Sequence, residues 1–169
     1  MNDEYVKPTQ KSVTCFLYCG DDYLFLERGM QKHVNPGKLN GVGGRVEKGE
    51  DYVSAAIREI EEETGYIVSV RDIEFCGMFI FEEGLPEHWV AAFFKVHVAD
   101  KRIPIGQETK DGKLLWLHED KVLDSGEKLL DDLYYCFNEI ILGKKLFFIT
   151  ANTDGTGKIL THSKQLLKR

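Results

Sequence analysis

The sequence predicts a single mixed α/β domain that spans residues 1–169. Short apolar runs bounded by Gly, Pro, Asn and Asp predict strands, and two longer segments carry apolar residues at helical spacing. With 43% hydrophobic residues the chain can bury one core, and no repeat, low-complexity tract or linker divides it. One domain of strands and helices is the economical interpretation.

The first part of the chain predicts a hairpin and a loop. A strand is expected over 12–18, a turn at 20–22 and a returning strand over 23–26. The stretch 29–38 has no clear period and contains an Asn-Pro-Gly turn signal, so we expect a loop there. Residues 39–42 predict a short strand that ends in glycines.

Residues 51–64 form the clearest predicted helix. Asp51 can act as the N-cap, and Gly65 stands where a helix commonly ends. On a helical wheel that places Glu59 at 0° and advances by 100° per residue, one group of side chains falls between about 60° and 160°. This group is Val53, Ala56, Ile57, Ile60 and Thr64. One side of the helix should therefore pack, and the other is acidic.

The rest of the chain predicts further strands around a second helix. Strands are expected over 67–70, 73–82 and 88–98, followed by a polar loop over 99–113 and a short apolar segment over 114–117. A second amphipathic helix is expected over 127–142, where Leu129, Leu130, Leu133, Phe137, Ile140 and Ile141 recur at three- and four-residue spacing. Segments 145–150 and 158–161 flank Asn152-Thr-Asp-Gly155, which predicts a hairpin-like ending.

Composition excludes several function classes. The formal net charge of −6 argues against duplex nucleic acid as the main partner, because affinity for the phosphate backbone comes largely from Lys and Arg. No apolar run is long enough to span a membrane, and the polar start Met1–Glu4 does not resemble a signal peptide. Cys15, Cys19, Cys76 and Cys136 form no Cys-x-x-Cys pair, which favours buried free thiols in a reducing cytoplasm.

The acidic face of the first helix has two interpretations. Glu59, Glu62 and Glu63 lie within an arc of about 100°, whereas Glu61 points elsewhere. Like charges at this spacing repel, and carboxylates in a last turn face the negative end of the helix dipole. The face is either a solvated surface on which Arg58 pairs with Glu62, or a site for a divalent cation. Oxygen ligands favour Mg²⁺, Mn²⁺ or Ca²⁺.

A glycine-rich loop precedes this helix. Gly41, Gly43 and Gly44 allow a close approach of the backbone to a ligand and leave carbonyl and amide groups free for metal or phosphate. The alternative is a plain turn. Taken together, the fixed positions run Gly44, Glu50, Arg58-Glu59-Ile60, Glu62-Glu63 and Gly65. This pattern over 44–66 resembles the Nudix box, with Tyr66 as one soft departure where an aliphatic residue is usual.

The resemblance implies a fold, a cofactor and a reaction. Nudix hydrolases cleave nucleoside diphosphates linked to another group, on an α/β/α sandwich with a mixed sheet and a loop–helix–loop motif. The resemblance implies that Glu59, Glu62, Glu63 and the carbonyl of Gly44 hold Mg²⁺, with Mn²⁺ as an alternative. Glu50 and Gly65 would be structural, and Arg58 would orient Glu59 by a charge-assisted hydrogen bond. The general base would be Glu59, Glu108 or Asp111, and the last two could equally be solvated loop acids.

Three stretches are similar to the MutT-like branch that removes oxidised purine nucleotides such as 8-oxo-dGTP. They are 37–44 with Asn40, 115–117, and 130–135 with Asp131 and Asp132. In that branch the matching asparagine contacts the base and the two acids read the purine edge, as carboxylates can. The alternatives are a turn residue for Asn40 and helix capping for the two aspartates.

The chain departs from that branch at Leu129, where animal members have a stacking tryptophan. Phe79, Phe81 or Tyr134 would have to compensate, so the resemblance implies broader activity on purine triphosphates. Two alternatives stay open: a Nudix hydrolase of ADP-ribose or a sugar nucleotide, and a binding or sensor module without turnover. The expected partner is a small nucleotide, and the expected assembly is a monomer or homodimer.

Overall fold

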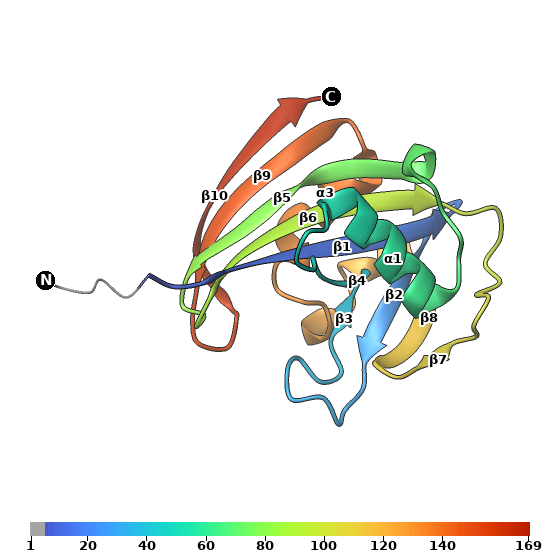
Figure 1. Cartoon of the computed structure of the whole chain (residues 1–169), viewed down its shortest axis with the longest axis horizontal. Coiled ribbons are helices and arrows are strands. Elements are labelled where there is room, and N and C mark those ends of the chain that lie inside the picture. The colour runs from blue at the N-terminus through green and yellow to red at the C-terminus, as the bar shows by residue number, and fades with distance from the viewer. Residues whose placement is uncertain (1–5) are drawn as a thin grey trace, which may run out of the picture.

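The computed structural model describes residues 6–169, which form one mixed sheet with helices on both faces (Figure 1). Its strands are β1 Thr9–Cys19, β2 Asp22–Arg28, β3 Leu39–Asn40, β4 Val42–Arg45, β5 Ile73–Glu83, β6 His88–His97, β7 Glu108–Thr109, β8 Gly112–His118, β9 Lys145–Thr153 and β10 Ile159–Lys168. Its helices are α1 Tyr52–Thr64, α2 Glu119–Val122 and α3 Leu133–Leu142, with 3₁₀ turns η1 Val70–Asp72 and η2 Gly126–Lys128. The acidic start Met1–Glu4 lies outside the described residues.

The sheet is split where the glycine loop enters it. The strand order is β10-β9-β5-β6-β1-β2-β8-β7, with β1–β6 and β5–β9 parallel and the other pairs antiparallel. β1 and β2 pair with each other only next to their turn, and beyond it β4 pairs with β1 while β3 pairs with β2. The glycine loop is therefore wedged between two central strands, and not attached to an edge.

Two hydrophobic cores confirm the predicted layered α/β architecture. On one face, α1 buries Ala55, Ala56 and Ile60 against β1, β4 and β6. On the other face, α3 buries Leu133 and Phe137 among aromatic side chains of the sheet. Figure 1 shows α1 in front of the sheet and α3 behind it. The two helices thus make the outer layers around one sheet.

The helix predicted over 51–64 is confirmed. The Asp51 side chain accepts a hydrogen bond from Ser54 N at 2.8 Å, which caps the N-terminus. Gly65 ends the helix in the left-handed region with φ 76°, and its N–H donates to Glu61 O. Thr64 is buried, whereas Glu61 is exposed as expected.

The strand predicted over 67–70 is wrong. This segment is irregular and leads into η1, while Ile67 and Val70 are 77% and 67% exposed. Ser69 and Asp72 form a reciprocal capping box, in which the Asp72 carboxylate accepts from Ser69 N at 2.7 Å. Local capping therefore decides this segment against its β-branched composition.

The helix predicted over 127–142 is right only from Leu133 onward. Leu129 is extended, forms a parallel bridge with Leu39 and is buried at 2% exposure. Leu130 N donates to Leu39 O at 3.0 Å, so this part of the chain pairs with β3 instead of continuing a helix. The predicted loop over 99–113 contains β7 and the start of β8, and α2 was not predicted.

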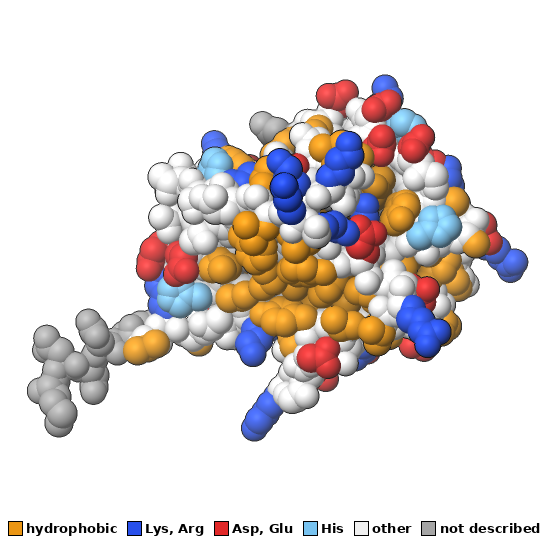
Figure 2. Space-filling view, turned by 90° about the horizontal axis from the view of Figure 1, so that it is seen from above, with side chains coloured by type: hydrophobic (Ala, Val, Ile, Leu, Met, Phe, Trp, Pro, Cys, Tyr) orange, Lys and Arg blue, Asp and Glu red, His pale blue; other side chains and the backbone are white. Residues whose placement is uncertain are grey.

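Most of the remaining predictions are confirmed with small shifts, but the last strand, predicted over 158–161, continues to Lys168. The strand predicted over 39–42 is interrupted at Gly41 and continues to Arg45, and the final turn lies at 154–158, two to three residues later than predicted. All four cysteines are free, with Cys19 half-buried and the others buried. Within the described part, no helix has the length and apolarity needed to cross a membrane. Seen from above, hydrophobic side chains gather in the middle of the molecule (Figure 2). The exposed hydrophobic side chains of the last two strands are Phe148 on β9 and Leu160, Leu166 and Leu167 on β10.

Candidate active site

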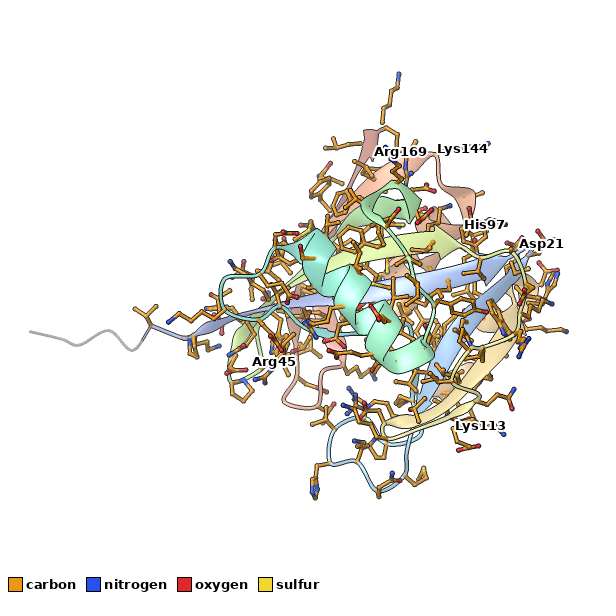
Figure 3. The ribbon with its side chains drawn as sticks, turned by 45° about the vertical axis from the view of Figure 1, so that its right-hand side comes forward. Asp21, Arg45, His97, Lys113, Lys144 and Arg169 are labelled. Carbon is orange, nitrogen blue, oxygen red and sulfur yellow. The ribbon has the colours of Figure 1, made fainter. Side chains whose placement is uncertain are left out.

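Arg58 organises the acidic face of α1. Its Nε and Nη2 atoms each donate to the Glu50 carboxylate at 2.9 Å, and Nη1 donates to Glu59 Oε1 at 2.9 Å. Its contact with Glu62 is longer, at 3.4 Å, and Nη2 also donates to Arg45 O at 3.1 Å. Arg45 ends β4 and is labelled in Figure 3. The guanidinium thus ties the glycine loop to the helix and holds Glu59 in one orientation.

The glycine loop is packed directly against two of the carboxylates. A Cβ added at Gly44 would lie 2.4 Å from Glu59 Oε1 and would push this carboxylate away from the loop. Gly43 N donates to Glu63 Oε2 at 2.8 Å. A Cβ at Gly43 would lie 2.0 Å from Val13 O, because the loop is wedged against β1. Close approach to the β1 backbone therefore requires glycine at position 43, and glycine at position 44 leaves room for the Glu59 carboxylate, neither of which a plain turn would demand.

The electrostatics of the carboxylates follow from this packing. Burial raises the pKa of Glu63 to about 7, although the Gly43 N–H lowers it, and the charges of Glu59 and Asp111 raise it further. Burial also raises the pKa of Glu59 against the effect of Arg58. In contrast, the hydrogen bond from Arg58 holds the pKa of Glu50 below its ordinary value. Negative charge is therefore costly at Glu59 and Glu63 and is compensated at Glu50.

The donor set fits a hard divalent cation. Glu59, Glu62 and Glu63 offer carboxylate oxygens on one helix face beside the carbonyl of Gly44, which is the ligand chemistry that Mg²⁺ and Mn²⁺ prefer. A cation would relieve the unfavourable charge at Glu59 and Glu63. Among the described residues, no three His, Cys, Asp or Glu side chains already converge on one point, since Arg58 holds Glu59 and Glu62 is 54% exposed.

The two loop acids lie in different surroundings. Glu108 is exposed on β7, and nothing in the described contacts joins it to α1. The charge of Asp111 raises the pKa of Glu63. The Asp111 carboxylate pairs with Lys32 at 2.6 Å, and its backbone carbonyl accepts a hydrogen bond from Gly29 N. Sequence reasoning missed Lys32, because the 29–38 loop has no period that would predict its neighbour. The structure brings Asp111 close to the acidic face and leaves Glu108 apart.

A backbone hydrogen bond brings the segments of the candidate base-reading residues side by side. The Leu130–Leu39 hydrogen bond sets the segment before Asp131 beside the segment of Asn40. Asn40 Oδ1 accepts from Gly41 N at 2.8 Å. The Asp131 carboxylate accepts from Ile159 N at 2.7 Å, so it holds the C-terminal hairpin and does not cap α3. Burial raises the pKa of Asp132 to about 7, against the N–H groups of Leu133 and Asp132 itself, which lower it.

Some of the aromatic side chains proposed to stack on the base are packed into the hydrophobic core. Phe79 and Phe81 stack with ring centroids 4.7 Å apart, but Phe79 is fully buried and only Phe81 is half-exposed. Leu129 is buried, and the Tyr134 hydroxyl donates to Gly126 O. Of these side chains, the half-exposed Phe81 and Tyr134, which is 39% exposed, offer a surface on which a planar ring could stack.

A family comparison agrees with the arrangement around α1. Residues 8–135 match the model of the NUDIX domain, which covers more than half of the chain. The chain belongs to the NUDIX domain family. The match begins just before β1 and ends within α3, so it contains the acidic helix, the glycine loop, Asp131 and Asp132.

Curated relatives of this NUDIX protein match over about two fifths of the chain. An uncharacterized Nudix hydrolase of Yersinia pestis is 44% identical over 71 residues, which are 41% of this chain and 38% of that protein. One of Streptomyces coelicolor is 40% identical over 67 residues, which are 40% of this chain and 36% of that protein. The match therefore spans less than two fifths of either relative.

Solved structures share the fold over most of the chain. A MutT protein from Bacillus halodurans has a TM-score of 0.78 and 22% identity, covering 92% of this chain and 97% of that one. A MutT protein from Methanosarcina mazei has a TM-score of 0.60 and 25% identity, covering 81% and 93%. A bifunctional NMN adenylyltransferase/ADP ribose pyrophosphatase from Francisella tularensis, complexed with AMP and a Mn ion, has a TM-score of 0.64 and 18% identity, covering 82% and 42%.

Proposed function

We propose that this NUDIX protein is a divalent-metal-dependent pyrophosphohydrolase that cleaves purine nucleoside triphosphates, including oxidised ones such as 8-oxo-dGTP, to the monophosphate and pyrophosphate. One observation carries the proposal. Arg58 fixes Glu59 against Gly44, while Gly43 fixes Glu63, so that an intact acidic face is built against a glycine loop that a substrate can approach. Packing alone would not require uncompensated acids there. The free cysteines agree with a reducing, cytoplasmic location.

The chain's own residues would perform three tasks. Glu59, Glu62, Glu63 and the Gly44 carbonyl would hold Mg²⁺ or Mn²⁺, which when bound neutralises phosphate oxygens and makes a bound water more acidic. Arg58 keeps Glu59 oriented toward the loop. Glu59 or Asp111 would take the proton from the attacking water at a carboxylate oxygen; of the loop acids, Asp111 is the one whose charge acts on Glu63.

Base recognition would fall to Asp132 with Asn40. A carboxyl with a pKa of about 7 exchanges between a form that donates a hydrogen bond and a form that accepts one. Such a group suits a purine edge that presents both donors and acceptors. Asp131 would position the neighbouring hairpin, since its carboxylate is already occupied by Ile159 N.

A second candidate is hydrolysis of another nucleoside diphosphate derivative, such as ADP-ribose or a sugar nucleotide. The buried Leu129 favours it, because this position offers no aromatic platform for an oxidised purine. The Francisella tularensis neighbour is described as an ADP ribose pyrophosphatase. At 18% identity, the likeness supports a shared fold and does not decide the substrate.

The test is Mg²⁺-dependent hydrolysis of 8-oxo-dGTP beside dGTP, ATP and ADP-ribose, with products separated as monophosphate and pyrophosphate. We expect faster turnover of the purine triphosphates. Faster turnover of ADP-ribose would replace the first substrate class with the second. No metal-dependent hydrolysis of any of the four would favour a binding module and overturn both proposals.

A further inference from the structure

A cavity of about 480 Å³ lies beside the candidate active site. It is formed by β2, β3, β8 and the segment 121–128, and its lining comprises Glu27, Leu39, Leu115, Leu117, Lys121, Asp124, Ser125 and Lys128. This volume lies within the range of small-molecule sites. No residue assigned above to metal or base binding lines it.

The cavity is separated from the base-reading acids by a wall. Leu39 lies next to Glu27 on one side, through the β2–β3 pairing. On its other side, Leu39 bridges to Leu129, which is buried, and its carbonyl accepts from Leu130 N. Asp131 follows beyond this wall. The cavity is therefore a second space on the sheet, and not an extension of the first.

One polar atom in the lining has no partner. The Ser125 hydroxyl oxygen is buried and makes no hydrogen bond with any group that the structure describes. Buried hydroxyls are normally paired, because a lost hydrogen bond to water is costly. A ligand atom in the cavity would satisfy it.

The lining also contains lysines that lie beside an apolar surface and have no ion-pair partner in the described part of the chain. Lys121 and Lys128 form no ion pair with any described side chain, although the whole chain has a net charge of −6. Lysine binds phosphate as a point charge, and the leucines offer an apolar surface for a ring. Glu27 and Asp124 can accept hydrogen bonds from hydroxyl groups. A ligand with a phosphate, a planar ring and hydroxyl groups would match these three features of the lining, and a nucleotide has all three.

We propose that this cavity binds a nucleoside monophosphate. The phosphate lies between Lys121 and Lys128, the base lies on Leu115 and Leu117, and Ser125 donates to the ligand. This site is distinct from the proposed hydrolytic site and does not require a metal ion.

The experiment titrates AMP, GMP or inorganic phosphate into the full chain carrying Glu62→Gln, in the presence of a chelator. Calorimetry measures the affinity, and methyl NMR follows the leucine side chains. We expect saturable nucleotide binding with shifts at Leu39, Leu115 and Leu117. Removing both lysines (Lys121→Ala with Lys128→Ala) should weaken binding by about tenfold or more.

The matched control removes two exposed lysines, one just before β9 and one at its first position, by Lys144→Ala with Lys145→Ala. It should leave affinity unchanged (Lys144 is labelled in Figure 3). If the variant without Lys121 and Lys128 does not fold, Ser125→Ala serves instead and should weaken binding by roughly fivefold. No saturation at millimolar nucleotide would overturn the proposal. Equal loss in the control pair, or phosphate binding as tightly as AMP, would do the same.

Failure of the proposed hydrolysis would look different. It would appear as absent turnover in the wild-type chain with metal, whereas the titration uses no metal and a disabled acidic face. Each result therefore stands alone.

Discussion

Two regions of this protein carry acids at helix ends, and they are built in different ways. In the region 40–65, the acids lie in the last two turns of α1, and their partners Arg58, Gly43 and Gly44 are at most 20 residues away in sequence. In the region 119–132, Asp131 binds Ile159 N, 28 residues away, and Leu129 pairs with Leu39. Short-range spacing therefore predicts the first region, whereas the second depends on which distant segments meet it.

Each region holds a half-buried carboxyl with a pKa raised to about 7. For Glu63, the neighbouring acids Glu59 and Asp111 add to the effect of burial. For Asp132, burial has the largest effect and the neighbouring Asp131 adds a smaller one. A divalent cation should therefore act on Glu63 and leave Asp132 unaffected, which separates the two regions by experiment.

The largest expected effect comes from Glu62→Gln. Because this change removes one charge from the acidic face without altering its shape, hydrolysis should fall by about 10²–10³-fold. Steady-state kinetics at saturating Mg²⁺ measure the loss. Glu61→Gln, one position away on the solvent side, is the matched control and should keep full activity; an equal loss in both variants would remove the metal role from this face.

Asp132→Asn tests the second region. Because an amide cannot exchange between pure acceptor and donor forms, kcat/KM for a purine triphosphate should fall roughly 10–100-fold. Metal affinity should not change, since α1 is untouched. Asp120→Asn, at a position where the acid is 80% exposed on α2, is the control. Unchanged kcat/KM in Asp132→Asn would return this residue to a structural role.

Glu63→Gln tests the cost of charge in the metal-free protein. The folded pKa of Glu63, about 7, lies above its ordinary value of 4.5, so the folded state binds more protons between these values. Stability therefore falls as pH rises through this window. At pH 8 the variant should be more stable than wild type by up to about 3 kcal/mol, and at pH 4 the difference should vanish. Urea unfolding at both pH values measures this.

Added Mg²⁺ should reverse that comparison at pH 8, because metal binding stabilises the wild-type acids and not the variant. A stability difference that does not depend on pH would show that Glu63 is not the group responsible.

The smallest effect is expected from Asp131→Ala. This change leaves Ile159 N without its acceptor, so unfolding free energy should fall by about 1–2 kcal/mol. Asp131→Asn keeps an oxygen acceptor and should lose less. Chemical denaturation of both variants provides the measurement. Equal stability of Asp131→Ala and wild type would free Asp131 for direct contact with the substrate.

The sequence by itself determined the caps of α1, the spacing of its acids, the glycine loop and most strands. These features depend on residues within a few turns of one another, and local hydrogen bonding and periodicity encode them. Where two local signals competed, as at 67–70, the Ser69–Asp72 capping box prevailed over β-branched composition.

Only the tertiary structure decided that α3 begins at Leu133, that Asp111 and not Glu108 approaches Glu63, and that Lys32 pairs with Asp111. Leu129 and Leu130 carry helical periodicity, yet the β3 backbone binds them in an extended form. The physical reason is that these backbone and charge contacts join segments between 48 residues (Glu63 and Asp111) and 90 residues (Leu39 and Leu129) apart. No periodicity within either segment records such a contact.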